Sequence, residues 1–75
     1  MNQAPIARRK LYQEVQERLL QRINAGEIRP GEQLPSEREL MEFYGVGRVA
    51  VREALQELAR SGIVEIRSEE RRVGK

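Results

Sequence analysis

The sequence predicts a small α+β domain that is mostly helical, with three helices followed by a short strand. An amphipathic stretch over residues 10–25 places apolar side chains at helical spacing. Two shorter helical patterns within residues 34–58 are separated by a Gly-Val-Gly turn. The run IVEI at residues 63–66 is β-branched and short, as a strand would be. These three observations predict the order helix, helix, helix, strand.

The composition limits the classes of protein to consider. The chain has 75 residues, enough for one small domain with a limited core. It contains no cysteine, so it has no disulfide framework and no thiolate metal site. No apolar run approaches the roughly 20 residues that cross a bilayer, and the basic start lacks the apolar stretch of a secretory signal. We expect a cytoplasmic protein without a cofactor or a membrane partner.

The charge is informative through its distribution. The net charge of +2 is modest, although the pI is about 9.5. Basic residues concentrate at residues 8–10 and at Arg38, Arg48 and Arg52, whereas the acids are spread along helical faces. This placement, more than the net charge, is compatible with a nucleic-acid partner.

The first predicted helix runs from Lys10 to Ala25. Its apolar residues recur every fourth position, and Gly26 is suited to end the helix with a left-handed backbone. We interpret it as a support helix that faces the core, and the alternative is a surface that binds a partner protein. The apolar stripe consists of Leu11, Val15, Leu19 and Ile23.

Two segments without helical periodicity flank this helix. Residues 1–9 are predicted to form a flexible arm, whose basic residues either touch a phosphate backbone or are simply solvated. Residues 27–33 are predicted to form a loop, with Pro30-Gly31 in a type II turn.

The second predicted helix has clear start and stop signals. Ser36 is a good N-cap, and Glu39 three residues later completes a capping box. Gly45 can supply the left-handed backbone that ends the helix after Tyr44. The hydroxyl of Tyr44 is a candidate phosphate donor, but an aromatic ring at this position more often packs in the core.

The third predicted helix begins at Gly47 and has two different faces. Arg48, Val49 and Arg52 share one face of its first turns. The other face carries Val51, Ala54, Leu55 and Leu58. A helix, a tight turn and a second helix with arginines at its N-terminal end make the arrangement of a helix-turn-helix DNA reader.

This arrangement predicts how each candidate residue would contact DNA. Arg48 and Arg52 lie one turn apart, and each guanidinium can grip a guanine edge or a phosphate with two hydrogen bonds. Val49 could contact a thymine methyl group, and Arg38 is placed to approach the same groove or its backbone. The free N–H groups at the two helix N-termini can bind phosphates directly. The candidate residues are Ser36, Arg38, Gly47, Arg48, Val49 and Arg52.

Surface ion pairing is the plainer interpretation of the same arginines. Arg38 could pair with Glu42 on its own helix, and Arg52 with Glu53 or Gln56. Such exposed pairs stabilise a protein by only about 0–1 kcal/mol. A catalytic interpretation has little support, because the chain has no histidine or cysteine and no nucleophile placed beside a base.

The final nine residues, RSEERRVGK, stand apart from the rest. They match one reading frame of a common sequencing adapter, so we interpret residues 67–75 as a tail foreign to the natural protein. A genuine basic tail is the alternative. Since no returning strand is evident in this segment, we expect a winged helix-turn-helix over residues 10–66 whose wing is incomplete.

The run PGEQLPSERELMEFYGVGRVAVREAL resembles the N-terminal winged helix-turn-helix of the GntR family of bacterial transcription regulators. The ending Arg-Glu-Ala-Leu resembles the branch with an all-helical, ligand-binding C-terminal domain. The resemblance implies a homodimeric, metabolite-responsive regulator, in most cases a repressor, that binds double-stranded operator DNA. It further implies that an effector-binding C-terminal domain is missing here and that this piece alone is a monomer.

By the same resemblance, Arg38, Arg48 and Arg52 match the arginines that contact the operator. Two positions depart from the family pattern: Gly47 stands where serine or threonine is frequent, and Val49 where a small hydroxyl or proline is frequent. The glycine that the family's wing inserts into the minor groove has no counterpart. The alternative function is a protein-interaction module that uses the same helical scaffold.

Overall fold

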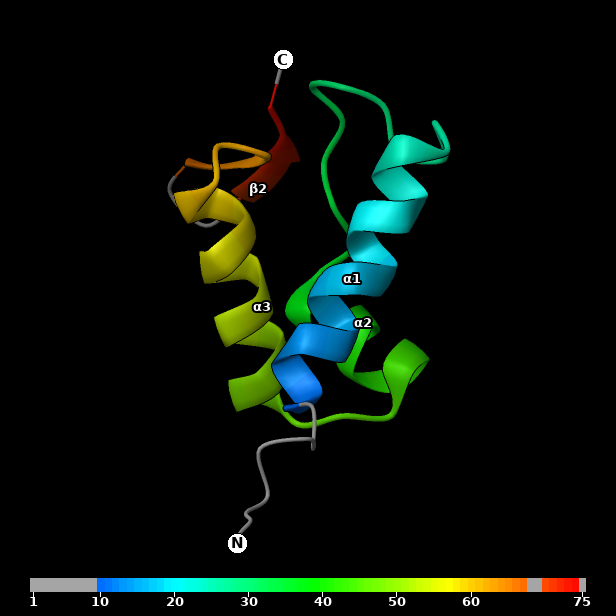
Figure 1. The fold of residues 1–75 in the computed structure, drawn as a ribbon, viewed down its shortest axis with the longest axis vertical. Helices are drawn as coiled ribbons and strands as arrows, with labels where there is room; N and C mark the ends of the chain where they lie inside the picture. Colours follow the sequence, from blue (N-terminus) through cyan, green and yellow to red (C-terminus); the bar gives the residue numbers. More distant parts are fainter. Residues whose placement is uncertain (1–9, 68–69, 75) are drawn as a thin grey trace, which may run out of the picture.

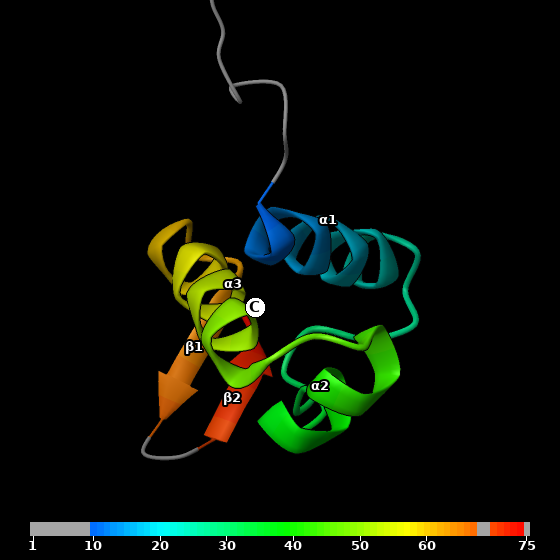
Figure 2. The same ribbon diagram turned by 90° about the horizontal axis from the view of Figure 1, so that it is seen from below.

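The computed structural model describes residues 10–67 and 70–74, which form three helices and a two-stranded antiparallel sheet. Helices α1 and α3 run side by side, with α2 near their N-terminal ends (Figure 1). The hairpin follows the C-terminal end of α3, on the side of α3 that faces away from α1 (Figure 2). The elements are α1 Leu11–Asn24, α2 Glu37–Tyr44, α3 Arg48–Arg60, β1 Val64–Arg67 and β2 Glu70–Val73. The predicted fold class is confirmed.

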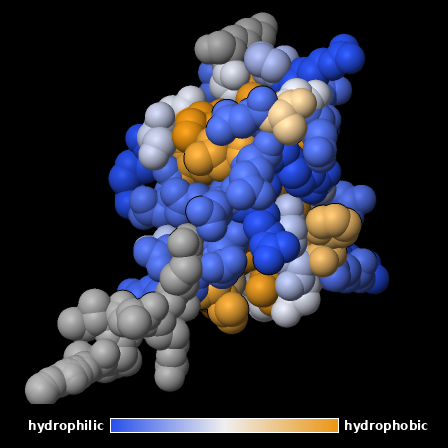
Figure 3. Space-filling view, turned by 45° about the vertical axis from the view of Figure 1, so that its right-hand side comes forward, coloured by the Kyte–Doolittle hydropathy of each residue, from blue (hydrophilic) through white to orange (hydrophobic). Residues whose placement is uncertain are grey.

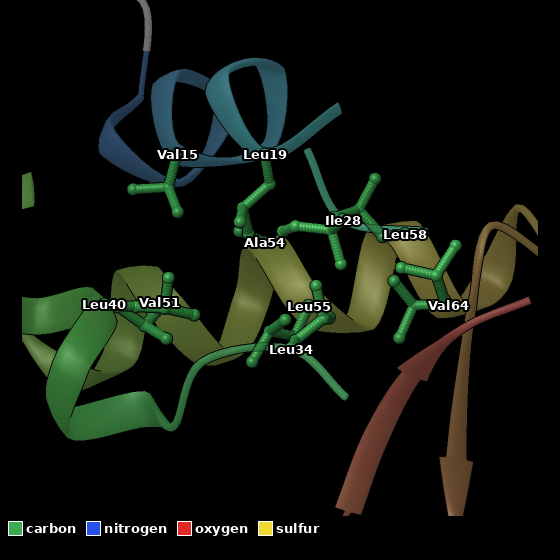
Figure 4. Close-up of a cluster of buried hydrophobic side chains, with 11 residues drawn as sticks. Val15, Leu19, Ile28, Leu34, Leu40, Val51, Ala54, Leu55, Leu58 and Val64 are labelled. Atoms are coloured by element: carbon green, nitrogen blue, oxygen red, sulfur yellow. The ribbon is translucent and has the colours of Figure 1, made fainter. Parts of the chain in front are cut away.

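The core lies where the three helices and the base of the hairpin meet. Val15 and Leu19 of α1 point toward α3, and Leu40 of α2 lies close to Val51 of α3 (Figure 4). The N-terminal helix is therefore the core-facing support that its apolar spacing predicts. The buried cluster consists of Val15, Leu19, Ile28, Leu34, Leu40, Val51, Ala54, Leu55, Leu58, Val64 and Val73.

Leu11 does not belong to this core, contrary to the prediction. Its side chain is 60% exposed, whereas Val15 and Leu19 are almost fully buried. The reason is its place as the first residue of α1, one turn beyond the cluster that α1 shares with α3. Leu11 instead lines a shallow apolar hollow together with Gly47 and Val49.

The predicted signals at the ends of α2 are confirmed. The Ser36 Oγ accepts a hydrogen bond from the Glu39 N–H at 3.1 Å, and Glu39 Oε1 accepts one from the Ser36 N–H at 2.8 Å. Gly45 ends the helix with φ of 66°, a left-handed conformation that costs glycine little. These local signals fix the turn that separates α2 from α3.

The expectation of an incomplete wing is wrong. Strand β2 returns antiparallel to β1, with Val73 opposite Val64 and both valines buried. The other edge of β2 pairs with the loop before α2, since the Leu34 N–H donates to the Arg71 carbonyl at 2.8 Å. Strand β2 lacks apolar alternation because one buried valine suffices when its backbone is paired on both edges.

Two further expectations concern the rest of the chain. Residues 1–9, for which a flexible arm is predicted, lie outside the described residues. None of the described helices has the length and apolar character that crossing a bilayer requires.

Candidate nucleic-acid interface

The N-terminal half of α3 presents the candidate residues on its solvent side. The side chains of Arg48 and Arg52 are 54% and 57% exposed, and Val49 is 73% exposed. The opposite side of the same turns is buried, with Ala50 and Val51 facing the core. Helix α3 is thus held by one face and leaves the other free to enter a groove.

The N-terminus of α3 is capped by backbone alone. Gly47 is the N-cap, with extended φ and ψ of −84° and 173° and no side-chain cap. Its lack of a side chain leaves the first N–H groups of the helix open, which is the arrangement that binds a phosphate oxygen.

Arg38 extends from the first turn of α2 and is the most exposed of the three candidate arginines, at 84%. Its Nε lies 3.5 Å from the Glu42 Oε2, so the predicted ion pair within α2 is present. Both side chains are largely in water, and such a pair contributes about 0–1 kcal/mol. The pair therefore leaves Arg38 available for an anionic partner.

The ion-pairing interpretation expects Arg52 to pair with Glu53 or Gln56, but its partner in the structure is Glu37. The Arg52 Nε donates to both carboxylate oxygens of Glu37, at 3.1 Å and 3.0 Å. Glu37 is the first residue of α2, so this contact joins the two helices of the helix-turn-helix.

Glu37 collects two more arginines around the same carboxylate. Arg71 Nη2 of strand β2 donates to its Oε2 at 3.0 Å, and Arg48 Nη1 lies 3.6 Å from its Oε1. We call Glu37, Arg48, Arg52 and Arg71 the Glu37 cluster. The Glu37 side chain is only 13% exposed, because the arginines cover it.

Sequence reasoning missed Glu37. Its partners stand 11, 15 and 34 positions away, so no local spacing points to them. The only signal in the sequence was an acidic residue in the first turn of the predicted second helix. The helix dipole is enough to explain an acidic residue at that position, so it indicated no further role.

A hollow of about 480 Å³ lies beside the Glu37 cluster. It is lined by residues 33–38 together with Arg52 and Arg71. The structure thus brings Ser36, Arg38 and Arg52 around one concavity. Gly47 and Val49 instead line the apolar hollow beside Leu11.

Tyr44 belongs to the core rather than to the interface. Its ring packs against the buried cluster, and its hydroxyl is buried without a hydrogen-bond partner among the described residues. A buried hydroxyl cannot reach a phosphate, so this structure supports the core interpretation.

Apolar side chains elsewhere on the surface are scattered. Figure 3 shows one mostly hydrophilic face on which they form separate patches. Phe43 is 72% exposed, and the Arg22 guanidinium lies over its ring at 5.5 Å. Within residues 10–67 and 70–74, no cluster of acidic residues is arranged to hold a metal ion.

Comparison with known proteins identifies relatives over nearly the whole chain. The family described as "Bacterial regulatory proteins, gntR family" matches residues 11–72. The HTH-type transcriptional repressor NanR of Enterobacter sp. (strain 638) is 55% identical over 71 residues, which cover 95% of this chain. NanR of Salmonella newport (strain SL254) is 54% identical over the same length. The chain spans 27% of the length of either relative.

Solved structures of related proteins share the fold. YtrA from Sulfolobus acidocaldarius, a GntR-family transcription factor, superposes with a TM-score of 0.84 at 28% identity. That match covers 92% of this chain and 73% of YtrA. The DNA-binding domain of AraR in complex with operator ORE1 superposes with a TM-score of 0.82 at 31% identity, covering 89% of this chain and 83% of that one.

Proposed function

Because the chain belongs to the GntR family of bacterial regulatory proteins, we propose that it reads a specific operator for a metabolite-responsive repressor. It is a DNA-binding domain of this family and not an enzyme. The observation that carries the finer proposal is the exposed face at the N-terminal end of α3, where two arginines flank a valine on a buried scaffold. The operator-bound state of the similar AraR domain and the repressor names of the NanR relatives support it.

Each candidate residue takes a role in this proposal. Arg48 and Arg52 read base edges in the major groove, and Val49 contacts a thymine methyl group. Arg38 binds a base or a phosphate. Ser36 and Gly47 mark the two helix N-termini whose free N–H groups bind phosphates and set the register of the domain on the duplex. At Ser36 these are the N–H groups of the first turn of α2, because the N–H of Ser36 itself donates to Glu39.

The assembly belongs to the same proposal. Two copies would read the two halves of an inverted repeat as a homodimer, held together by a C-terminal domain that binds a small-molecule effector. The length of the NanR relatives, of which this chain spans 27%, leaves room for such a domain. The 75-residue chain alone would be a monomer and would bind one half-site weakly, because it lacks the linkage that joins both halves.

Selection of DNA from a random pool tests the proposal. The purified 75-residue chain is incubated with a pool of randomised duplexes, and the bound fraction is amplified and sequenced over several rounds. We expect one short motif, bound more tightly than a scrambled duplex, with an affinity that falls steeply as salt rises. A bound pool that stays random through all rounds would contradict sequence-specific reading.

We also propose that residues 67–75 are foreign to the natural protein. The pairing of β2 with its neighbours is made by backbone groups, which any sequence supplies. Two of its side chains make further contacts, since Arg71 donates to Glu37 and Arg72 to the Gly31 carbonyl. Sequencing the source locus past the codon for Ile66 tests it. A different continuation supports the proposal, and the same nine residues in the genome would refute it.

A further inference from the structure

We propose that Glu37 is a positioning residue that holds Arg52 for base reading and so sets the specificity of the domain. This inference rests on the proposed function, since it concerns how one of the reading arginines is presented. Glu37 itself faces three arginines and is mostly covered, so it does not contact DNA directly in this arrangement.

The geometry of the contact shows which part of Arg52 is held. Only the Nε of Arg52 is bonded to the Glu37 carboxylate. Among the described residues, the two terminal nitrogens of Arg52 donate no hydrogen bond. These terminal nitrogens form a fork that matches the O6 and N7 acceptors of guanine. Glu37 therefore fixes the side chain at its inner nitrogen and leaves the reading end free.

Holding the arginine matters because its long side chain has many rotamers. An unrestrained arginine loses that freedom on binding a base, and this loss weakens the complex. An arginine fixed beforehand loses less and can present its fork in one direction. The same arginine, if released, can still reach any nearby phosphate, and phosphate contacts carry no sequence information.

The charge of the cluster points to the same role. One carboxylate faces three guanidinium groups, so the cluster keeps a positive excess while its most buried member is negative. Removing the carboxylate would raise the positive charge at the interface and strengthen the part of binding that does not depend on sequence. A positioning role therefore predicts opposite changes for operator and non-operator DNA.

The test compares Glu37→Gln with the wild-type 75-residue chain. Fluorescence anisotropy measures binding to the duplex that the wild type selects from a random pool, and to a scrambled duplex of the same length. For Glu37→Gln we expect operator affinity to fall about tenfold, as for partial loss of one bidentate base contact. Affinity for the scrambled duplex should rise severalfold.

Glu53→Gln is the matched control. It removes the same charge from the residue next to Arg52 on α3, and Glu53 is exposed. We expect both affinities to rise together, with their ratio unchanged. Glu37→Asp keeps the charge but has a shorter side chain. It should also lower the ratio of operator affinity to scrambled-duplex affinity, and it provides the test if Glu37→Gln fails to fold.

The outcomes separate this inference from the proposed function. A wild-type chain that binds both duplexes equally would refute the proposed function itself. A wild type that prefers its selected duplex, with an unchanged affinity ratio in the folded Glu37 variants, would overturn only the positioning role. A lower melting temperature with an unchanged ratio would assign Glu37 to stability alone.

Discussion

At the scale of single residues, the candidate arginines differ in how firmly they are held. Arg52 is anchored to Glu37 through a bifurcated hydrogen bond, while Arg48 lies 3.6 Å from the same carboxylate, beyond hydrogen-bonding distance. Arg38 is exposed and, among the described residues, pairs only with its helix neighbour Glu42. A held guanidinium suits the reading of a base, and a mobile one suits a phosphate, whose oxygens accept from many directions.

Replacing Arg52 tests its assignment as a base reader. We expect Arg52→Ala to weaken operator binding by about 1–3 kcal/mol. Arg52→Lys should keep most of the affinity for a scrambled duplex but lose operator affinity, because lysine lacks the planar fork. Binding is measured by fluorescence anisotropy at fixed salt.

The control for this series is Arg60→Ala, at the far end of α3, where the arginine pairs with Glu57. It should leave operator preference unchanged. The unfolding free energy of Arg52→Ala should change by no more than about 1 kcal/mol, since Arg52 is 57% exposed and the covered Glu37 carboxylate keeps Arg71 as a partner. A loss of stability equal to the loss of binding would favour the ion-pairing interpretation of Arg52.

At the scale of elements, the turn between α2 and α3 sets the position of the reading helix. Its two glycines have different structural roles, because Gly45 ends α2 and Gly47 begins α3. Gly45 has a left-handed φ of 66°, whereas Gly47 has an ordinary φ of −84° and caps α3. Apart from the adjoining residues of the chain, no described atom lies within 4 Å of a Cβ added at either glycine, so backbone conformation distinguishes them.

The same substitution at the two glycines should have different effects on stability. Gly45→Ser should lower the unfolding free energy by about 1–2 kcal/mol, the cost of a left-handed backbone for a residue with a Cβ. Gly47→Ser should be neutral or stabilising by a few tenths of a kcal/mol, because serine is a good N-cap. Thermal unfolding followed by circular dichroism measures both, and equal losses would contradict the assigned roles.

The elements that could be predicted are those with local signals. The capping box at Ser36, the stop at Gly45 and the apolar spacing of α1 and α3 each lie within a few residues of one another. Strand β2 was not predicted, because its sequence ERRV has no apolar alternation and one of its two edges pairs with a loop about 40 residues earlier in the chain, as in the bridge between Gln33 and Arg72. The role of Glu37 was missed for the same reason.

At the scale of the whole molecule, a small core must hold both the reading helix and the hairpin. Buried side chains from α1, α2 and the hairpin all pack against α3 in the one core cluster (Figure 4). A domain of this size has a total stability of only about 4–11 kcal/mol. The position of α3 therefore depends on a few fully buried side chains.

Two leucines of α1 differ in burial, since Leu19 lies in the core and Leu11 at its edge. Leu19 is fully buried, so Leu19→Ala should destabilise the domain by about 2–5 kcal/mol. Leu11 is 60% exposed, and Leu11→Ala should cost less than about 1 kcal/mol. Urea unfolding measures both, and a large loss for Leu11→Ala would place that residue back in the core.

The most direct test of the account is to map the DNA-contacting surface of the whole domain. Amide chemical shifts of the ¹⁵N-labelled 75-residue chain are followed while the selected duplex is added. The largest changes should fall at residues 36–38 and 47–52, the two helix N-termini and the first turns of α3. Largest changes at Glu17, Arg18 and Gln21 on the outer face of α1, with the start of α3 unchanged, would contradict the account.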